Sequence, residues 1–280
     1  MSHLIDSKTL MEQLEQDAPP VIVDCRFDLS NPELGHQQYT QGHIPQAHYL
    51  DLNCDLSGQV VAGQTGRHPL PEPKALCIKL GSLGISSTEA VVAYDGAQGA
   101  FAARLWWLLR WLGHDRVQVL DGGLANWVSE GGALSNALPS PKKAKFVQRA
   151  SLTRTCQMQD IRHRKAHLVD ARDEPRFLGR HEPIDPVAGH IPGAINIPFQ
   201  NNLQNGRFKA PTDLRTQFTT KAIGLDDEVI CYCGSGVTAA HTLLALLEAG
   251  YPEPSLYPGS WSEWIVDPQN PVARGDHDGP

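Results

Sequence analysis

Short apolar runs alternate with longer segments of helical character along this chain of 280 residues. Residues 229–232 are almost wholly apolar, which is typical of a strand that helices cover on both faces. Residues 239–249 are rich in alanine and leucine and stop at Gly250, and this pattern predicts a helix. Repeated alternation of this kind predicts an α/β fold, in which each parallel sheet is flanked by helices.

The most apolar long stretch lies at residues 101–112 and is interrupted by Arg104 and Arg110. A helix that spans a bilayer needs about 18 or more predominantly apolar residues in succession. No part of the sequence reaches that length. We therefore expect a buried helix at 101–112 rather than a membrane span.

Four sequence blocks occur twice in the chain, in the same order in both copies. The paired blocks are residues 23–26 and 169–172, 42–47 and 189–194, 91–96 and 229–234, and 121–127 and 258–264. Such ordered self-similarity predicts two homologous domains. The spacing between the copies shortens after the second block, so the first copy carries extra residues. We place them in the stretch 58–73, which is rich in glycine and proline.

The segment between the two copies is rich in serine, proline and lysine, as is typical of a linker. We expect an N-terminal domain at residues 1–135, a linker at 136–153 and a C-terminal domain at 154–280. The copies differ at one position that matters for chemistry, because Asp95 of the first aligns with Cys233 of the second. An aspartate cannot act as a thiolate, so we expect the first domain to be inactive.

Composition narrows the classes of partner and the compartment. The net charge of −7 argues against nucleic acid and anionic membranes as main partners. The six cysteines have neither the density of a disulfide-rich secreted domain nor the spacing of a zinc site. The beginning of the chain is polar and does not have the pattern of a signal peptide. We therefore expect a cytoplasmic protein. Because a chain with two tandem domains can complete its pocket alone, we also expect a monomer, and no metal or organic cofactor is implied.

Cys233 lies where the predicted strand ends, and a loop of small residues at 234–238 joins it to the predicted helix. The first amides of a helix lack internal partners, and the helix dipole adds positive potential there. Glycines let several such N–H groups point at one anion, so a thiol in this loop should lose its proton easily and act as a nucleophile. From this residue alone the alternative, a buried cysteine of the core, stays open.

Several motifs together resemble those of tandem-domain rhodanese sulfurtransferases. They are the repeated Asp-x-Arg and Gly-His-Ile-Pro-x-Ala blocks, the Cys-Gly-Ser-Gly-Val-Thr loop and the Gly-Ser-Trp-Ser-Glu-Trp block. The resemblance covers nearly the whole chain and implies two rhodanese-like domains, with a catalytic C-terminal domain that forms a persulfide on Cys233. Gly234 and Ser235 stand where the thiosulfate type usually carries Arg and Lys, so the loop looks like the 3-mercaptopyruvate sulfurtransferase type.

The resemblance implies that a sulfane sulfur passes from 3-mercaptopyruvate to a thiol, cyanide or a thioredoxin-like protein. Arg176 matches a family arginine that binds the donor carboxylate, which a guanidinium can do bidentately. The usual place of a second arginine reads Pro-Ile-Asp-Pro at residues 183–186, and Arg180 is the candidate replacement. Without the resemblance, Arg176 would be interpreted as a surface arginine paired with Glu174 or Asp173.

The family also suggests a proton relay of a serine, a histidine and an aspartate. The serine matches Ser235 and the histidine matches His68, whereas the aspartate position holds Asn53. Asparagine can orient a histidine but cannot stabilise its charge as a carboxylate can, so Asp51 or Asp55 is the candidate substitute. The expected catalytic residues are Cys233, Ser235 and His68. The residues expected to bind the donor are Arg176, Arg180, Gly234, Gly236, Val237, Thr238 and Trp261.

Other interpretations compete with this one. A cysteine phosphatase needs an arginine at the sixth position after the cysteine, where this chain has Ala239. A thioredoxin-like oxidoreductase needs Cys-x-x-Cys, whereas Cys231 and Cys233 form only a Cys-x-Cys pair. The alternatives that remain are a thiosulfate:cyanide sulfurtransferase and a sulfur-carrier protein with little turnover of small molecules. The residues that recur in both copies are expected to be structural: Asp24, Arg26, His43, Asp170, Arg172 and His190.

Overall fold

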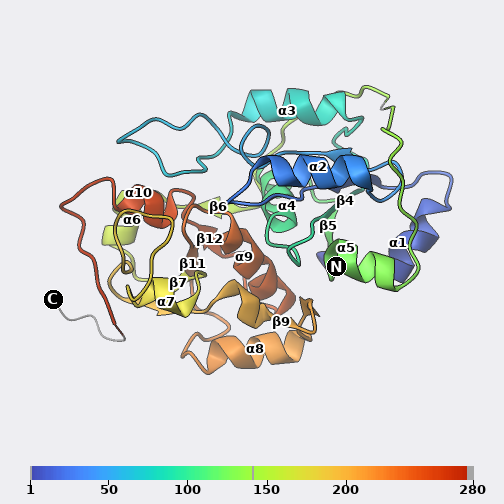
Figure 1. Ribbon diagram of the computed structural model, residues 1–280. Helices are drawn as coiled ribbons and strands as arrows, with labels where there is room; N and C mark the ends of the chain where they lie inside the picture. The colour runs from blue at the N-terminus through green and yellow to red at the C-terminus, as the bar shows by residue number, and fades with distance from the viewer. Residues whose placement is uncertain (1, 141, 276–280) are drawn as a thin grey trace. The chain divides into compact units, whose positions relative to one another are not determined.

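The computed structural model describes residues 2–140 and 142–275 (Figure 1). The chain divides into two compact units. The first unit is Met1–Gly58 with Leu70–Leu152, and the second is Gln59–Pro69 with Thr153–Pro280. The segment 59–69 therefore groups with the second unit, although it lies within the stretch of sequence predicted as the N-terminal domain. The predicted linker groups with the first unit as far as Leu152.

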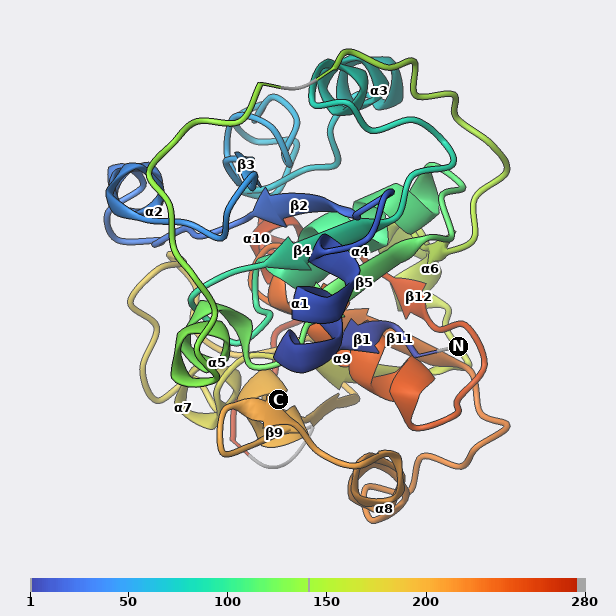
Figure 2. The same ribbon diagram turned by 90° about the vertical axis from the view of Figure 1, so that its right-hand side faces the viewer.

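The first unit contains a five-stranded sheet in the order β1-β5-β4-β2-β3, and every neighbouring pair is parallel. Figure 2 shows this sheet, with α1 crossing in front of it. The strands are β1 (Leu4–Ile5), β2 (Val21–Asp24), β3 (His48–Tyr49), β4 (Val91–Tyr94) and β5 (Val117–Leu120). The helices are α1 (Ser7–Leu14), α2 (Glu33–Gln41), α3 (Pro73–Ser82), α4 (Ala102–Trp111) and α5 (Gly123–Ser129).

Local sequence signals explain where several of these helices begin. The Asp6 carboxylate accepts a hydrogen bond from the Thr9 amide at 2.9 Å, which caps α1. Glu72 caps α3 in the same way, and Pro73 occupies the first helical position, where its missing N–H costs nothing. The buried helix predicted at residues 101–112 is confirmed as α4, whose side chains are buried except at Trp111.

The second unit repeats the architecture of the first. Its five-stranded sheet has the order β6-β12-β11-β7-β8 and is again parallel throughout. The strands are β6 (Arg154–Thr155), β7 (His167–Asp170), β8 (Ala194–Asn196), β11 (Val229–Tyr232) and β12 (Ser255–Leu256). Strands at matching positions of the two sheets carry the matching sequence blocks, so the prediction of two homologous α/β domains is confirmed.

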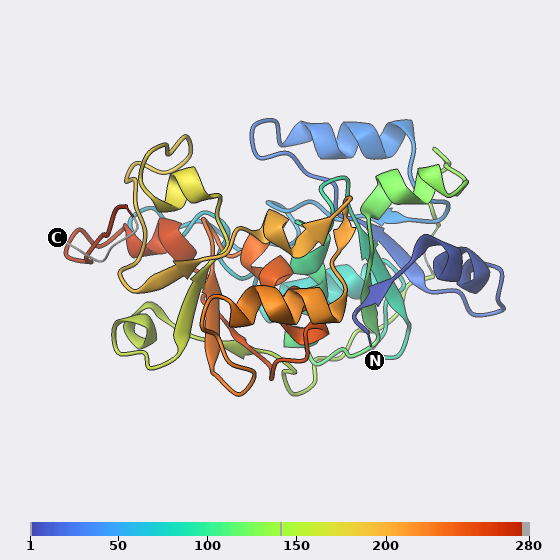
Figure 3. The same ribbon diagram turned by 90° about the horizontal axis from the view of Figure 1, so that it is seen from below.

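Helices flank the second sheet, and Figure 3 shows α8 in orange, facing the viewer. They are α6 (Met158–Arg162), α7 (Glu174–Phe177), the 3-10 helix η1 (Phe199–Asn202), α8 (Pro211–Thr219), α9 (Thr238–Glu248) and α10 (Ser260–Trp264). A short antiparallel hairpin joins β9 (Leu203–Gln204) to β10 (Arg207–Phe208). The predicted helix at 239–249 is confirmed as α9, which packs against β11 and α8.

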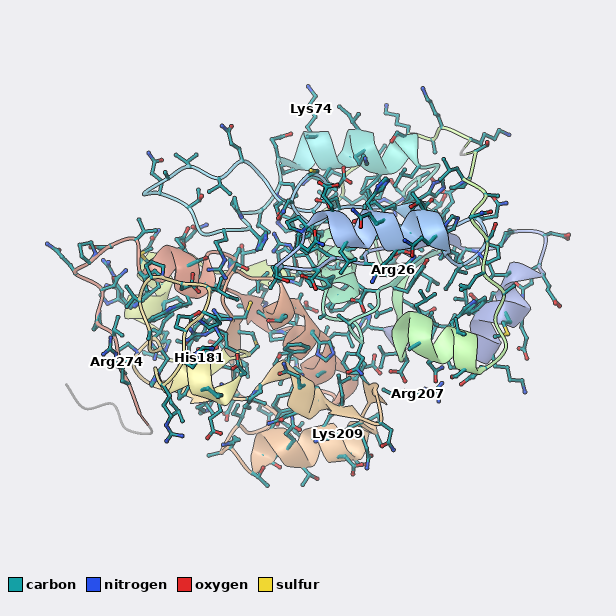
Figure 4. The ribbon with its side chains drawn as sticks, viewed as in Figure 1. Arg26, Lys74, His181, Arg207, Lys209 and Arg274 are labelled. Atoms are coloured by element: carbon teal, nitrogen blue, oxygen red, sulfur yellow. The ribbon has the colours of Figure 1, made fainter. Side chains whose placement is uncertain are left out.

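Both domains contain the same buried ion pair at the carboxyl end of the fourth strand of the sheet, β2 in the first domain and β7 in the second. Arg26 Nη2 lies 2.6 Å from Asp24 Oδ2, and Arg172 Nη2 lies 2.6 Å from Asp170 Oδ2. Each guanidinium also donates to a backbone carbonyl of the following Gly-His-Ile-Pro block, at 2.7 and 2.8 Å. Because the pairs occur in both domains and hold one loop to another, they are structural, as predicted. Arg26 is labelled in Figure 4.

The histidine of that block is structural in both domains as well. His43 Nδ1 lies 2.8 Å from the carbonyl oxygen of Tyr39, and His190 Nδ1 lies 2.8 Å from that of Phe177. Each imidazole also stacks on the ring of the same partner residue.

Within the part of the chain that the structure describes, no helix is long and apolar enough to cross a membrane.

Candidate active site

Cys233 follows β11 directly, at the edge of the sheet where the carboxyl ends of the parallel strands meet. Its backbone N–H donates to Ser260 Oγ at 3.1 Å, and its carbonyl accepts from the amide of Trp261 at 3.0 Å. The cysteine is therefore held from the side of α10, and only 2% of its surface is exposed. A reagent must enter the cradle of the loop to reach its sulfur.

The loop after Cys233 brings a backbone amide to the sulfur. The N–H of Gly236 donates to Cys233 Sγ at 3.2 Å. Gly236 has φ +76°, and a Cβ at this position would lie 2.3 Å from the carbonyl oxygen of Pro258. The left-handed backbone and the close approach both require glycine here. Gly234, Val237 and Thr238, the other loop residues expected to bind the donor, lie around this contact.

The corresponding loop of the first domain shows how such amides gather around an anion. The carboxylate of Asp95, the counterpart of Cys233, is fully buried. It accepts four backbone hydrogen bonds of 2.7–2.9 Å, from the amides of Ala97, Gly99, Phe101 and Ala102. Burial raises the pKa of Asp95, and these amides oppose that rise. The loop of the first domain is thus a cradle for a carboxylate, and the loop of the second domain places Cys233 at the matching position with the Gly236 amide donating to its sulfur.

Ser235 and His68 meet beside the cysteine. His68 Nδ1 lies 2.7 Å from Ser235 Oγ, and both side chains are buried. His68 comes from the segment 59–69, which passes over the start of α10. The amide of Arg67 donates to Ser262 Oγ at 3.0 Å, and a Cβ at Gly66 would lie 2.6 Å from the carbonyl oxygen of Gly259. The structure therefore brings together the serine and histidine that the sequence analysis paired.

The candidates for the third relay position form their own turn in the first unit. Asp51 accepts hydrogen bonds from the amides of Asn53 and Cys54, at 2.8 and 2.9 Å. Asp55 accepts from the Asp51 amide and pairs with Lys79 at 2.8 Å. That Asn53, Asp51 or Asp55 orients His68 stays a prediction.

Arg176 is bound by acidic residues that lie after α7 in the sequence. Its Nε donates to both carboxylate oxygens of Glu182 at 3.0 Å, and its Nη2 lies 3.0 Å from Asp185 Oδ2. The alternative interpretation, which paired Arg176 with Glu174 or Asp173, is therefore wrong about the partners. Burial works against the charge of Glu182, but hydrogen bonds from Arg176 and from loop amides prevail and lower its pKa.

Arg67 is a site residue that the sequence analysis missed, as it missed the site roles of Glu182 and Asp185. Arg67 Nη1 pairs with Asp185 Oδ1. A Cβ at Gly234 would lie 2.8 Å from Arg67 Nη2 and 3.3 Å from Arg176 Nη2, so both guanidinium groups border the residue next to Cys233. The sequence did contain a signal for Arg67: it is adjacent to His68, so a contact between His68 and Ser235 also places Arg67 near the loop after Cys233. Arg180, the candidate from the sequence, is exposed and lies three residues after the last residue of α7.

Trp261 is a buried support of the site. Its Nε1 donates to the carbonyl oxygen of Val187 at 2.9 Å, and its ring lies 4.8 Å from the guanidinium carbon of Arg172. The first contact anchors the segment between α7 and β8, and the second lies at the loop between β7 and α7. A direct contact of Trp261 with the donor stays a prediction. Among the described residues, no cluster of three or more histidine, cysteine or acidic side chains could hold a metal ion.

Comparison of this sequence and structure with known proteins identifies a matching domain family and several relatives. The rhodanese-like domain model matches residues 6–130 and 155–267. A Pseudomonas aeruginosa protein named "Probable 3-mercaptopyruvate sulfurtransferase" is 51% identical over 264 residues, covering 91% of this chain and 93% of that protein. The thiosulfate sulfurtransferase of Rattus norvegicus is 33% identical over 289 residues, covering 97% and 95%. The structure of 3-mercaptopyruvate sulfurtransferase from Leishmania major is similar with a TM-score of 0.84 and 29% identity, covering 94% and 74%.

Proposed function

Because the chain belongs to the rhodanese family, whose domain model matches both of its halves, we propose that it transfers a sulfane sulfur from 3-mercaptopyruvate through a persulfide on Cys233. The relatives are sulfurtransferases of both the 3-mercaptopyruvate and the thiosulfate type, and this chain is a sulfurtransferase enzyme. The donor, the persulfide and the acceptor are the parts that we propose.

The observation that carries the proposal is the hydrogen bond from the Gly236 amide to Cys233 Sγ. A donor aimed at the sulfur stabilises a thiolate or a persulfide anion, by the same logic as an oxyanion hole. The repeated loop of the first domain holds a carboxylate in this way, which supports the assignment of the second loop as an anion cradle. A core cysteine without a chemical role needs no such arrangement.

In the first half-reaction, the thiolate of Cys233 attacks the sulfur of 3-mercaptopyruvate. An S–S bond forms, the C–S bond of the donor breaks, and its electron pair leaves with the enolate of pyruvate. The enolate carbon takes up a proton and becomes pyruvate. Ser235 and His68, 2.7 Å apart and buried, form the pair that we assign to that proton transfer. Such general acid catalysis contributes typically about 10²–10⁴-fold.

In the second half-reaction, an acceptor takes the outer sulfur of the persulfide. A thiol, a cyanide ion or the thiol of a thioredoxin-like protein attacks that sulfur, the S–S bond to Cys233 breaks, and the thiolate is restored. The acceptor leaves as a persulfide or as thiocyanate. Both steps are nucleophilic displacements at sulfur, and as written neither step uses a metal or an organic cofactor.

Two guanidinium groups beside Gly234 supply the cations that the donor requires. We assign the donor carboxylate to Arg176, through its Nη1, because Nε and Nη2 are already bound to Glu182 and Asp185. The same two cations also suit the sulfite that thiosulfate releases, so thiosulfate:cyanide transfer is the second candidate function.

We further propose that the enzyme works as a monomer in the cytoplasm. Its six free cysteines are in keeping with that compartment.

The test is steady-state kinetics with 3-mercaptopyruvate and with thiosulfate, using cyanide as the common acceptor, together with mass spectrometry of the enzyme after one donor addition. We expect a gain of one sulfur atom on Cys233 and a preference for 3-mercaptopyruvate. Cys233→Ser should abolish both, while Cys54→Ser, which alters an exposed cysteine, is the control. Substantial turnover by Cys233→Ser would refute the assignment of the nucleophile. A persulfide without turnover would favour a sulfur carrier.

A further inference from the structure

Four charged side chains are gathered beside the residue that follows the nucleophile. They are Arg67, Arg176, Glu182 and Asp185, and their charges sum to zero. The side chains of Glu182 and Asp185 are each only 3% exposed. Electrostatic interactions are much stronger at such buried positions than in water. The charge balance of this group should therefore decide which anions can approach Cys233.

Asp185 holds the central place in this group. One of its carboxylate oxygens pairs with Arg67 Nη1 and the other with Arg176 Nη2. It therefore occupies, from within the chain, the position between two guanidinium groups in which a small anion would bind. Burial raises the pKa of Asp185, and the charge of Arg67 opposes that rise.

The loop that carries Asp185 is anchored along its length. The amides of Ile184 and Asp185 donate to Glu182 Oε1 at 3.0 and 3.1 Å. Further on, Trp261 Nε1 donates to the carbonyl of Val187, and Arg274 Nε donates to that of Ala188 at 3.1 Å. Figure 4 labels Arg274 and also His181, which precedes the loop in the sequence. The carboxylate is thus built into the site rather than carried on an open surface.

Neighbouring charges do not alter the balance. Arg172 Nη1 lies 3.5 Å from Glu182, but Arg172 is neutralised by Asp170 at 2.6 Å. Gly234 has no side chain, and this leaves room for the guanidinium groups of Arg67 and Arg176, because a Cβ at this position would contact both. The positive potential beside Cys233 therefore depends on Arg67 and Arg176 as reduced by Asp185 and Glu182.

We propose that Asp185, through its pair with Arg67, is the residue that sets donor selectivity. Its negative charge reduces the potential of the two arginines to a level that admits a monoanionic 2-oxo acid thiol and disfavours dianionic thiosulfate. Arg67 keeps Asp185 in place while Arg176 takes the donor carboxylate. This inference rests on the proposed sulfur transfer and adds the cause of its donor preference.

The test is a charge cycle over Asp185→Asn, Arg67→Gln and the double variant. For each we would measure kcat/KM with thiosulfate and with 3-mercaptopyruvate. Asp185→Asn should raise the thiosulfate to 3-mercaptopyruvate ratio by about 10-fold, the low end for one buried charge at short range. Arg67→Gln should lower the ratio by a similar factor. The double variant restores the net charge, so its ratio should return toward that of the wild type.

Controls separate the charge effect from misfolding and from failure of the proposed function. Asp226→Asn removes an exposed carboxylate before β11, at the opposite end of that strand from Cys233, and should leave the ratio unchanged. Absence of a Cys233 persulfide with either donor in the wild type would overturn the proposed function itself. With a persulfide formed, a ratio that stays within twofold in a folded Asp185→Asn would overturn only the inference. If Asp185→Asn does not fold, an unchanged ratio in Arg67→Gln overturns it instead.

Discussion

Gly236→Ala tests the anion cradle at its narrowest point. The residue has φ +76°, and its amide donates to Cys233 Sγ at 3.2 Å. Left-handed backbone costs a residue with a Cβ about 1–2 kcal/mol. In addition, the new Cβ would lie 2.3 Å from the carbonyl oxygen of Pro258, and a backbone atom cannot move aside as the end of a flexible side chain can. The loop must shift, and the shift carries the amide away from the sulfur.

The expected effect on activity is larger than the effect on stability. Loss of one preorganised donor at a developing anion costs typically about 2.7–4 kcal/mol, which is about 10²–10³-fold in kcat. We expect a fall of that size in the rate of persulfide formation. The free energy of unfolding should fall by roughly 1–3 kcal/mol, the range for residues held in strained backbone regions.

The assay combines single-turnover persulfide formation, followed by mass spectrometry, with urea unfolding. The matched control is Gly131→Ala, because Gly131 also has positive φ, +87°, but a Cβ there would meet nothing within 4 Å. It should lose stability to a similar backbone strain and keep full activity. Persulfide formation at the wild-type rate in Gly236→Ala would show that this amide does not stabilise the reacting sulfur.

Two more expectations concern the proton pair and the acidic residues at Arg176. Ser235→Ala and His68→Gln should each lower kcat with 3-mercaptopyruvate by about 10²-fold or more and change the thiosulfate rate much less, because sulfite leaves without needing a proton. The double variant should be no worse than either single one, and additive losses measured by steady-state kinetics would contradict a shared role. Glu182, whose pKa is held below its ordinary 4.5, stabilises the fold above that pH, and this contribution is lost as pH falls through the lowered pKa. Glu182→Gln should therefore flatten the fall in unfolding free energy, measured with urea, as the pH is lowered below the ordinary pKa of 4.5. An unchanged slope would argue against the ion pair with Arg176.

The sequence by itself determined two kinds of feature: secondary structure, which depends on neighbouring residues, and the domain repeat, which appears as paired sequence blocks. The apolar run before Cys233, the small loop and the alanine- and leucine-rich stretch predicted β11, the cradle and α9, because strand and helix patterns depend on neighbouring residues. The repeated blocks predicted two homologous domains and, through Asp95, a first domain without the nucleophile. The structural role of the residues that form the two buried ion pairs was also predicted, because these residues recur in both copies.

Only the tertiary structure decided which charged residues lie together beside the nucleophile. Arg67 and Asp185 are 118 positions apart, and no local pattern states that the segment 59–69 lies against the loop after α7. A sequence of charges also does not say which of them lie together, as the exposed Arg180 and the half-buried, ion-paired Arg67 demonstrate. Long-range burial arises from the packing of whole elements, and it is this packing that converts four scattered charged residues into one balanced group beside Cys233.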